Sequence, residues 1–520
     1  MGAIDWGIVF VYIAGIIWLG FYLGRDQETE KDYYLAGRGM RPWQVALSIV
    51  STQISAISLI GAPAFVALKK GGGVFWLQYE LAVPLAMVAI LLFLVPAYHR
   101  EHVITIYELL ERRFDRKLRK SISFIFLLSR GLGTGVALLA TSVVTSVCLS
   151  IPLTYTILLV GVVTIIYTTM GGIKADIYSD IIQFFVFVGG ILFAIGFVVA
   201  FLLKSGTPIE FPDPSRLTVF KLGETGLKSG ETFGFWPMLL GGFFLYFSYY
   251  GCDQSQAQRI LTTATPEQAQ KALVINGLLR FPVTLIYIAF GLLLIPFIAT
   301  HPHFYKVLQG KPADFLVPHF IVQFFPVGLR GIMVSGIFAA TMSSVDSALN
   351  SLSAATWVDF LQPVFGKRVK SKMPVLRGLT IFWGLFAIAS SFYFMGGSET
   401  VIELVNKVGS AFYGPILAVF VMAIFLKGLK GNAVLFGLIS GVLTNVVLWL
   451  FFQRQVSWMW WNFTGFAVPF LFVFFHSVVL GRRIEFVRVS VTRRAVGYAR
   501  ILIFAFPVFV AVCYAIEKLL

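Results

Sequence analysis

Charged side chains are scarce in this chain of 520 residues. Asp, Glu, Lys and Arg together make up 13% of it, whereas hydrophobic residues make up 58%. Because a soluble globular protein carries about 25% charged residues, this composition excludes an ordinary soluble fold. Apolar runs of about 18 or more residues recur along the whole length, and each can span a lipid bilayer. We therefore expect residues 1–520 to form a single transmembrane domain.

Cysteine and histidine are also rare, with three and six copies. Cys148, Cys252 and Cys513 all stand in apolar surroundings, a pattern that fits neither a disulfide framework nor a metal motif. No cluster of histidines and cysteines suggests a transition metal. The sequence also lacks a nucleophile–base arrangement and a glycine-rich loop that would cradle phosphate, so we expect no enzyme.

Other features are missing as well. The first residues do not form a basic region followed by a cleavage site, so residues 5–24 are expected to remain as a first span. No sequence repeat of fixed period is visible, and no soluble output domain is expected after residue 500. The net charge of +16 does not indicate a nucleic-acid partner, because the charge lies between apolar spans. No obligatory protein partner is evident.

Hydrophobic patterning predicts an all-α polytopic membrane protein with about fourteen transmembrane helices. The predicted spans are 5–24, 43–68, 74–97, 121–149, 153–170, 177–203, 235–252, 272–299, 327–353, 375–396, 404–426, 433–452, 457–476 and 498–517. Between the eighth and ninth spans, the stretch "PADFLVPHFIVQFF" within 301–326 predicts a short external helix lying over a mouth.

Lysine and arginine alternate from one side of these spans to the other. Of the 41 copies, 27 lie in alternate loops that begin with 25–42. The positive-inside rule places these loops in the cytoplasm. We therefore expect a multi-pass protein of the plasma membrane with both termini extracytoplasmic. Two further cations, Arg130 and Lys407, are expected at the membrane interface.

Polar side chains gather inside the ninth span, in "MSSVDSALNS" at 342–351. Ser343, Asp346 and Ser347 stand at i, i+3 and i+4, so they share one helical face. Their hydroxyl and carboxylate oxygens are hard ligands that suit a small hard cation such as sodium. The alternative is hydrogen bonding between helices, which we prefer for Ser351 and Ser353.

Two other spans carry signs of an interrupted helix. "SIVSTQISAISLIGAPAF" at 48–65 mixes small polar residues and ends at Pro63, which predicts either a broken helix or a proline kink with small-residue packing. In "YTTMGGIKADIYSDIIQFF" at 167–185, a Gly-Gly turn leads into a helix. The helix dipole alone could explain Asp176 in its first turn, whereas Asp180 lies one turn deeper and is less easily explained this way.

Ionisable side chains also lie singly within spans. Glu80 and Arg280 either pair with each other or contact a ligand, and the sequence leaves both readings open. The segment "DQSQAQR" at 253–259 taken alone indicates only a helix end followed by a polar loop.

Four motifs in order resemble the sodium/solute symporter family, which contains the sodium–glucose cotransporters. They are "DYYLAGRGMRPW" at 32–43, "GGIKADIYSDIIQ" at 171–183, "DQSQAQR" at 253–259 and "MSSVDSALNS" at 342–351. The sequence of residues 213–276 is similar to that of the iodide, monocarboxylate and multivitamin transporters of this family.

This resemblance implies sodium-coupled symport by alternating access. It also implies a LeuT-type core of two inverted five-helix repeats, at 43–203 and 235–426. One extra helix at 5–24 would precede them, and three accessory helices within 433–520 would follow.

The resemblance further implies one or two sodium ions. The first site would use the backbone carbonyls of Ser51, Ile54 and Ala340 and the hydroxyls of Ser343 and Ser344. A possible second site would use Asp180, Ser343, Asp346 and Ser347. Because Asp346 replaces a residue that is often Ser or Thr in the family, this second site would be richer in negative charge.

The family also suggests where a small-molecule substrate would bind. The matching positions are Ser58, Glu80, Tyr246, Arg280 and Asn406, with Tyr249 as an aromatic inner gate. Glutamate with arginine suits the hydroxyls of a sugar or polyol, which we favour slightly. Because arginine also binds carboxylates in bidentate fashion, a carboxylate, vitamin or inorganic anion is the alternative. A channel, a solute sensor and a proton-coupled carrier are the competing classes.

Overall fold

The computed structural model describes residues 1–25, 29–53, 56–206, 208, 210–369, 371–395, 401–481 and 483–519. The described chain is mostly helical, as the composition predicts. Helices satisfy their own backbone hydrogen bonds, which lipid cannot do for them.

The first half of the chain contains ten α-helices and two shorter helical segments. They are α1 (Ala3–Leu23), α2 (Glu30–Leu35), η1 (Ala36–Arg38), α3 (Pro42–Gln53), α4 (Ala56–Ala67), α5 (Trp76–Glu80), α6 (Ala82–Ala89), η2 (Ile90–Leu94), α7 (Val95–Glu101), α8 (Glu108–Arg113), α9 (Arg116–Leu149) and α10 (Leu153–Ser205).

The second half adds twelve α-helices, four shorter segments and two strands. They are η3 (Pro214–Leu217), η4 (Pro237–Gly241), α11 (Gly242–Cys252), α12 (Gln254–Leu261), α13 (Pro266–Ala299), α14 (Pro302–Leu308), η5 (Ala313–Phe315), α15 (Leu316–Phe324), α16 (Leu329–Ala355), η6 (Thr356–Leu361), α17 (Gln362–Phe365), α18 (Met373–Phe394), α19 (Val401–Phe425), β1 (Leu426–Lys427), α20 (Gly431–Phe452), α21 (Trp460–Val479), β2 (Glu485–Phe486) and α22 (Arg493–Leu519). The strands β1 and β2 pair antiparallel.

The predicted number of fourteen spans is not confirmed. Among the described residues, eleven helices are long and apolar enough to cross a membrane, or twelve if the bent pair α3–α4 counts as one span. Two further predicted spans are helical, but in the part that the structure describes their apolar helices have fewer than the 18 residues needed to cross a bilayer. One of them, 153–170, forms the first part of α10, and the other, 235–252, contains η4 and α11.

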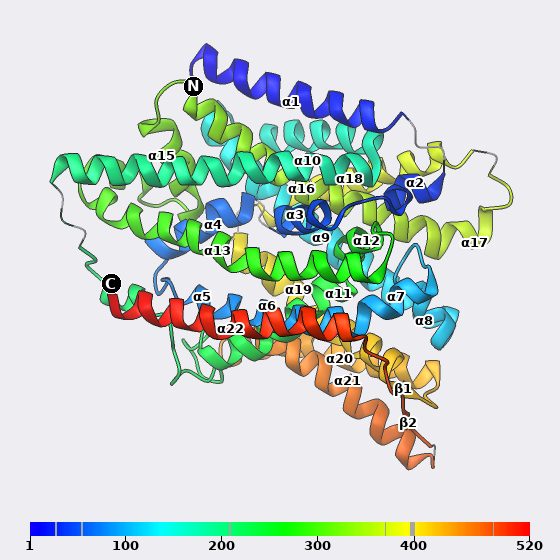
Figure 1. Cartoon of the computed structure of the whole chain (residues 1–520). Coiled ribbons are helices and arrows are strands. Elements are labelled where there is room, and N and C mark those ends of the chain that lie inside the picture. Colours follow the sequence, from blue (N-terminus) through cyan, green and yellow to red (C-terminus); the bar gives the residue numbers. More distant parts are fainter. Residues whose placement is uncertain are drawn as a thin grey trace.

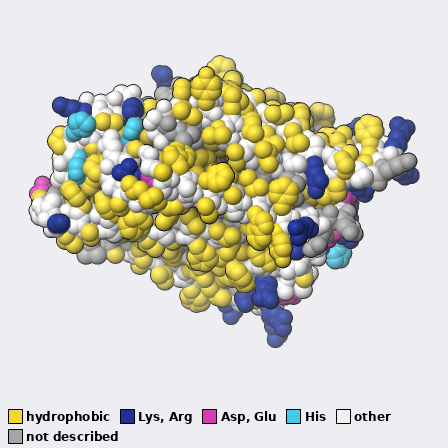
Figure 2. Space-filling view, turned by 90° about the horizontal axis from the view of Figure 1, so that it is seen from above, with side chains coloured by type: hydrophobic (Ala, Val, Ile, Leu, Met, Phe, Trp, Pro, Cys, Tyr) yellow, Lys and Arg dark blue, Asp and Glu magenta, His cyan; other side chains and the backbone are white. Residues whose placement is uncertain are grey.

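The helices run side by side, and the two termini lie at the same end of the bundle (Figure 1). The helices α8 and α17 and both strands lie at the opposite end, with the lysine- and arginine-rich loops that surround them. Seen from above, hydrophobic side chains cover the middle of the molecule, and most Lys, Arg and His lie toward its ends, with a further group of Lys and Arg at the lower edge (Figure 2). This arrangement suits a bilayer around the middle. The predicted external segment is helical, as α14 and α15.

Three interruptions bring backbone and polar groups into the centre of the bundle. The helices α3 and α4 are bent by 52°, and the break precedes α4, so Pro63 lies within that helix and does not cause it. Gly172 interrupts α10 with φ 55° and ψ −172°, a conformation available essentially to glycine alone. Asp253 is extended between α11 and α12, and its carboxylate accepts a hydrogen bond from the Ser255 amide at 2.8 Å.

The polar helix α16 lies in the middle of this arrangement. It packs against α1, α3, α9, α10 and α18. Its serines and Asp346 are therefore buried, and they must find partners on the neighbouring helices.

Candidate functional site

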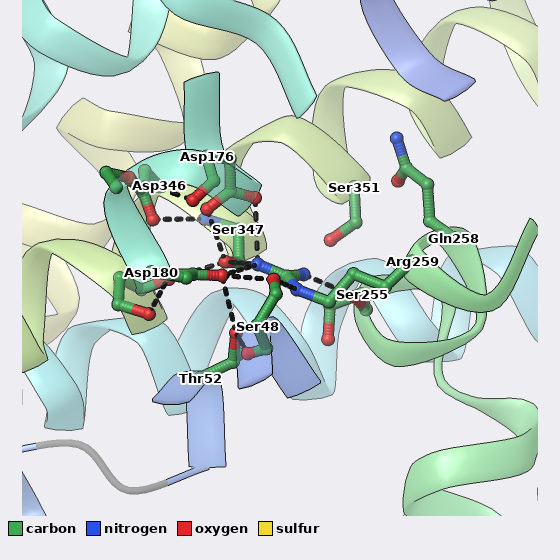
Figure 3. A network of polar contacts seen from close by, with 12 residues as sticks. Ser48, Thr52, Asp176, Asp180, Ser255, Gln258, Arg259, Asp346, Ser347 and Ser351 are labelled. Atoms are coloured by element: carbon green, nitrogen blue, oxygen red, sulfur yellow. Dashed lines mark hydrogen bonds and ion pairs between the residues drawn. The ribbon is translucent and has the colours of Figure 1, made fainter. Parts of the chain in front are cut away.

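Three carboxylates from two helices meet near the interruption of α10 (Figure 3). They belong to Asp176 and Asp180 of α10 and to Asp346 of α16, and one oxygen of each lies within 4.8 Å of the others. All three residues are at most 3% exposed. Like charges so close and so deeply buried require a cation nearby or protonation.

Arg259 of α12 supplies one positive charge to this acidic cluster (Figure 3). Its Nη2 donates to Asp176 Oδ2 at 2.8 Å and to Asp180 Oδ2 at 3.1 Å, and it also contacts the Ser347 hydroxyl. Nε donates to Ser48 Oγ at 2.8 Å, and the side chain is completely buried. The interpretation of this segment as a polar loop at a helix end was therefore wrong. Neither Asp176 nor Arg259 was predicted as part of a site.

Serine hydroxyls complete the cluster. Ser343 donates to Asp180, and Ser347 donates to Asp176 Oδ1 at 2.9 Å. The structure thus brings together all four residues predicted for the second sodium site, with Asp176 in addition. Three carboxylates against one guanidinium leave an excess of negative charge. Such an oxygen-rich, acidic site suits a small hard cation, and sodium binding there stays a prediction.

The first predicted sodium site lies where α16 meets the end of α3. The Ser344 hydroxyl donates to the Thr52 carbonyl oxygen at 2.7 Å. Ser51, Ser343 and Ser344 are all buried. Ile54 lies outside the described residues, and so does the side chain of Ala340. The described part therefore shows the contact between the two helices, and the full ligand set stays a prediction.

A cavity of about 120 Å³ lies beside this contact. Its lining includes every residue predicted for the substrate site: Ser58, Glu80, Tyr246, Tyr249, Arg280 and Asn406. Thr52 and Ser344 line it as well. A solute in the cavity would therefore lie next to the first sodium position.

Glu80 and Arg280 pair with each other, and both also line the cavity, so ligand contact stays open beside the ion pair. Arg280 Nε donates to Glu80 Oε2 at 2.9 Å, and Nη2 donates to Oε1 at 3.0 Å. The Tyr246 hydroxyl donates to the same carboxylate at 3.3 Å. Arg280 Nη1 is buried, with no hydrogen-bond partner among the described residues.

Arg130 is a second arginine of the cavity, and its prediction as interfacial was wrong. The helix α9 begins at Arg116, so Arg130 lies well inside it and lines the cavity with a side chain only 14% exposed. Its guanidinium carbon is 5.7 Å from the centre of the Tyr249 ring, and Nη1 is 3.9 Å from Asp253 Oδ2. In the part of the chain that the structure describes, Arg130 Nε has no hydrogen-bond partner.

The fold and these interrupted helices define a secondary transporter. A sodium-coupled sialic acid symporter, solved in a substrate-bound outward-open state, shares the fold with a TM-score of 0.75 and 22% identity, over 92% of this chain and 98% of that one. Mhp1, a nucleobase-cation-symport-1 family transporter, shares the fold with a TM-score of 0.53 and 15% identity, over 90% of this chain and 97% of Mhp1. The LeuT-type fold is thereby confirmed.

The sequence matches the family model of the Sodium:solute symporter family over residues 33–441, and the chain belongs to that family. It is 26% identical to the sodium/sialic acid symporter NanT of Aliivibrio fischeri, over 89% of this chain and 91% of that protein. It is 27% identical to the human sodium-coupled monocarboxylate transporter 1, over 84% and 70%. The protein is a sodium-coupled symporter of the membrane and not an enzyme.

Proposed function

We propose that this symporter imports a small organic solute that carries a carboxylate together with hydroxyl groups. The observation that carries this proposal is Arg130, a largely buried cation on the cavity wall whose buried Nε has no partner among the described residues. A buried donor without a partner costs free energy, which a substrate carboxylate would recover. Relatives named for sialic acid and for monocarboxylates support the same solute class.

The other side of the cavity suits hydroxyl groups. The Glu80 carboxylate is already neutralised by Arg280, so it would accept hydrogen bonds from a polyol without adding a net charge to the site. Tyr246 and Asn406 line the same cavity. The sugar or polyol favoured from the sequence stays a second candidate, which differs from the first only in lacking the carboxylate.

Sodium would couple to this solute through the contact between α3 and α16. Ser344 and Thr52 lie at that contact and also line the cavity. An ion that draws the two helices together would complete the wall, and the affinities for ion and solute would then rise together. Gln256 Nε2 donates a hydrogen bond to the Tyr249 hydroxyl at 2.8 Å, which supports the assignment of Tyr249 as the inner gate.

The charge of the solute bears on the number of ions. One sodium with a monoanion would carry no net charge, so the membrane potential would do no work. A second sodium would restore one charge, worth about 2.3 kcal/mol per 100 mV. The acidic cluster is the candidate place for that ion. We further propose that the repeats comprise 43–203 and 235–426, and that the termini are extracytoplasmic at the plasma membrane.

Replacing Arg130 by glutamine should raise the KM for a carboxylate solute about 10- to 150-fold, because a hydrogen bond to a charged group is worth about 1.5–3 kcal/mol. The measurement is sodium-driven uptake into proteoliposomes, with sialic acid, a monocarboxylate and a neutral sugar as probes. A Lys407→Gln variant, which removes a cation near Gln453 outside the cavity, is the matched control.

Equal KM values for Arg130→Gln and the parent protein would refute the carboxylate assignment. Accumulation driven by a pH gradient in sodium-free buffer would favour proton coupling instead. Currents far above carrier turnover, without accumulation, would favour a channel.

Replacing Asp346 by alanine should lower the Hill coefficient for sodium from near two toward one, because it removes a carboxylate of the acidic cluster. Uptake at varied sodium concentration measures this directly. Ser351→Ala serves as a control on the same helix, since the Ser351 hydroxyl bonds only to the Ala348 carbonyl in the described structure. An unchanged Hill coefficient in Asp346→Ala would rule out a second sodium at this position.

A further inference from the structure

A second, larger hollow of about 600 Å³ lies at the end of the bundle opposite the termini, away from the solute cavity. It is bounded by α7, by the first turn of α13, by the end of α19 and by the segment 487–492 that leads into α22. That segment is fixed where the Val487 amide donates to the Phe425 carbonyl at 2.7 Å. We call this feature the cationic hollow.

The lining of the cationic hollow is strongly positive. Its ionisable side chains are Arg38, His99, Arg100, His102, Arg113, Glu267, Lys427 and Arg488. Glu267 is the one acid among these described lining residues. Arg100 pairs with Glu101 at 3.3 Å, just outside the lining. The other four cations surround a space that contains a single carboxylate, a balance that favours an anion.

Two of these arginines are held in place by neutral groups. Arg113 donates from Nε to the Ala423 carbonyl at 2.6 Å and from Nη2 to the Leu426 carbonyl at 3.1 Å. Arg38 donates to the Val103 carbonyl at 3.0 Å. Among the described residues, neither guanidinium forms an ion pair with a carboxylate within 4.0 Å, and Arg38 feels the Glu108 carboxylate only from a greater distance. Their positions are fixed, and their charges are not neutralised by an ion pair.

Two long helices also begin at the hollow. Pro266 opens α13, of 34 residues, and Arg493 opens α22, of 27 residues. The lining includes Glu267 of the first helix and Ala495 of the second. Helix N-termini carry partial positive charge and attract phosphate, which adds to the field of the cations that line the hollow.

Most of the remaining lining is apolar, apart from Gln270, Ser490 and Thr492. This apolar surface distinguishes a lipid from a free ion. Leu92, Phe93, Pro96 and Ala97 line one side of the hollow, and Val487, Val489 and Val491 line another. Leu92 and Phe93 are only partly buried. A free inorganic anion would gain nothing from these surfaces, whereas acyl chains would cover them.

We propose that the cationic hollow binds the phosphate group of an anionic phospholipid, with the acyl chains along the apolar side. The lipid comes from the leaflet on the side opposite the termini. Because α7, α13, α19 and α22 all contribute to the hollow, the lipid joins elements that lie far apart in the sequence and stabilises their packing.

The test uses the full-length protein, purified in detergent and stripped of lipid. Phosphatidylglycerol, phosphatidylcholine and inorganic phosphate are titrated separately, and lipid retention is followed by native mass spectrometry alongside the unfolding temperature. We expect phosphatidylglycerol to be retained and to raise the unfolding temperature, and the other two to have little effect. Equal effects of phosphatidylglycerol and phosphatidylcholine would overturn the proposal, as would an inorganic phosphate effect as large as that of the lipid.

A variant locates the site. Arg488→Gln removes an exposed cation of the hollow, so folding should be preserved, and we expect phosphatidylglycerol affinity to fall at least fivefold. Arg368→Gln removes an exposed cation outside the hollow's lining and should leave the affinity unchanged. Equal losses in both variants, or none in Arg488→Gln, would show that the lipid binds elsewhere. None of these readouts depends on transport, so they fail or succeed independently of the proposed solute.

Discussion

Replacing Arg259 by methionine is expected to reduce sodium-driven uptake more than 100-fold and to lower the unfolding temperature of the purified protein. The guanidinium holds Asp176 and Asp180 at 2.8 Å and 3.1 Å in a fully buried setting. Removing one partner of a buried ion pair costs about 3–5 kcal/mol, because the remaining charge stays buried without compensation. Thermal unfolding and uptake in proteoliposomes measure the two effects.

A second substitution separates charge balance from other roles of this arginine. Arg259→Met combined with Asp176→Asn removes one charge of each sign, and we expect it to recover most of the lost stability. Arg368→Met on the surface is the control for the loss of a cation. If the double variant is no more stable than Arg259→Met, ion pairing with Asp176 is not what makes Arg259 necessary.

Replacing Ser344 by alanine is expected to raise the sodium concentration for half-maximal uptake at least tenfold. The Ser344 hydroxyl lies where α16 meets the end of α3, 2.7 Å from the Thr52 carbonyl oxygen. Loss of one ion ligand worth about 1.4 kcal/mol corresponds to a tenfold weaker affinity. Uptake at varied sodium, with the solute at saturation, measures the effect.

Ser353→Ala is a suitable comparison for that experiment. Ser353 lies on the same helix, and its hydroxyl donates to the Leu376 carbonyl at 3.0 Å and contacts the Tyr34 hydroxyl at 3.1 Å. Its role is therefore packing between helices, as the sequence predicts. Similar sodium dependence in Ser344→Ala and the parent protein would remove the hydroxyl of Ser344 from the sodium site.

The sequence predicts the inward face of α16 well, because helical spacing alone places Ser343, Asp346 and Ser347 together. Their partners across the bundle are harder to predict. Hydropathy marks 253–271 as a loop, yet every residue of α12 is buried, because this short helix folds back against α3 and α16. The local sequence does not show that the chain folds back in this way. The one sequence signal for Arg259 was that the acids within the spans need a positive partner.

Arg130 was misjudged, and the choice between a broken helix and a proline kink at 48–65 stayed open, for a related reason. The position of a cation in the membrane depends on where its helix begins, and α9 extends five residues before the predicted span. Proline is a known cause of kinks, but the bend between α3 and α4 precedes Pro63. Helix ends and bends are set by tertiary packing, which overrides the local signals at these places.

The backbone conformation of Gly172 sets the direction in which the rest of α10 runs. Asp180 lies eight residues beyond it, and at 1.5 Å per helical residue the arm is about 12 Å long. A rotation of about 10° at Gly172 would shift the Asp180 carboxylate by about 2 Å, enough to break its hydrogen bonds. Any residue with a β-carbon would be strained at φ 55°. The alignment of Asp180 with its partners across the bundle therefore depends on glycine at position 172.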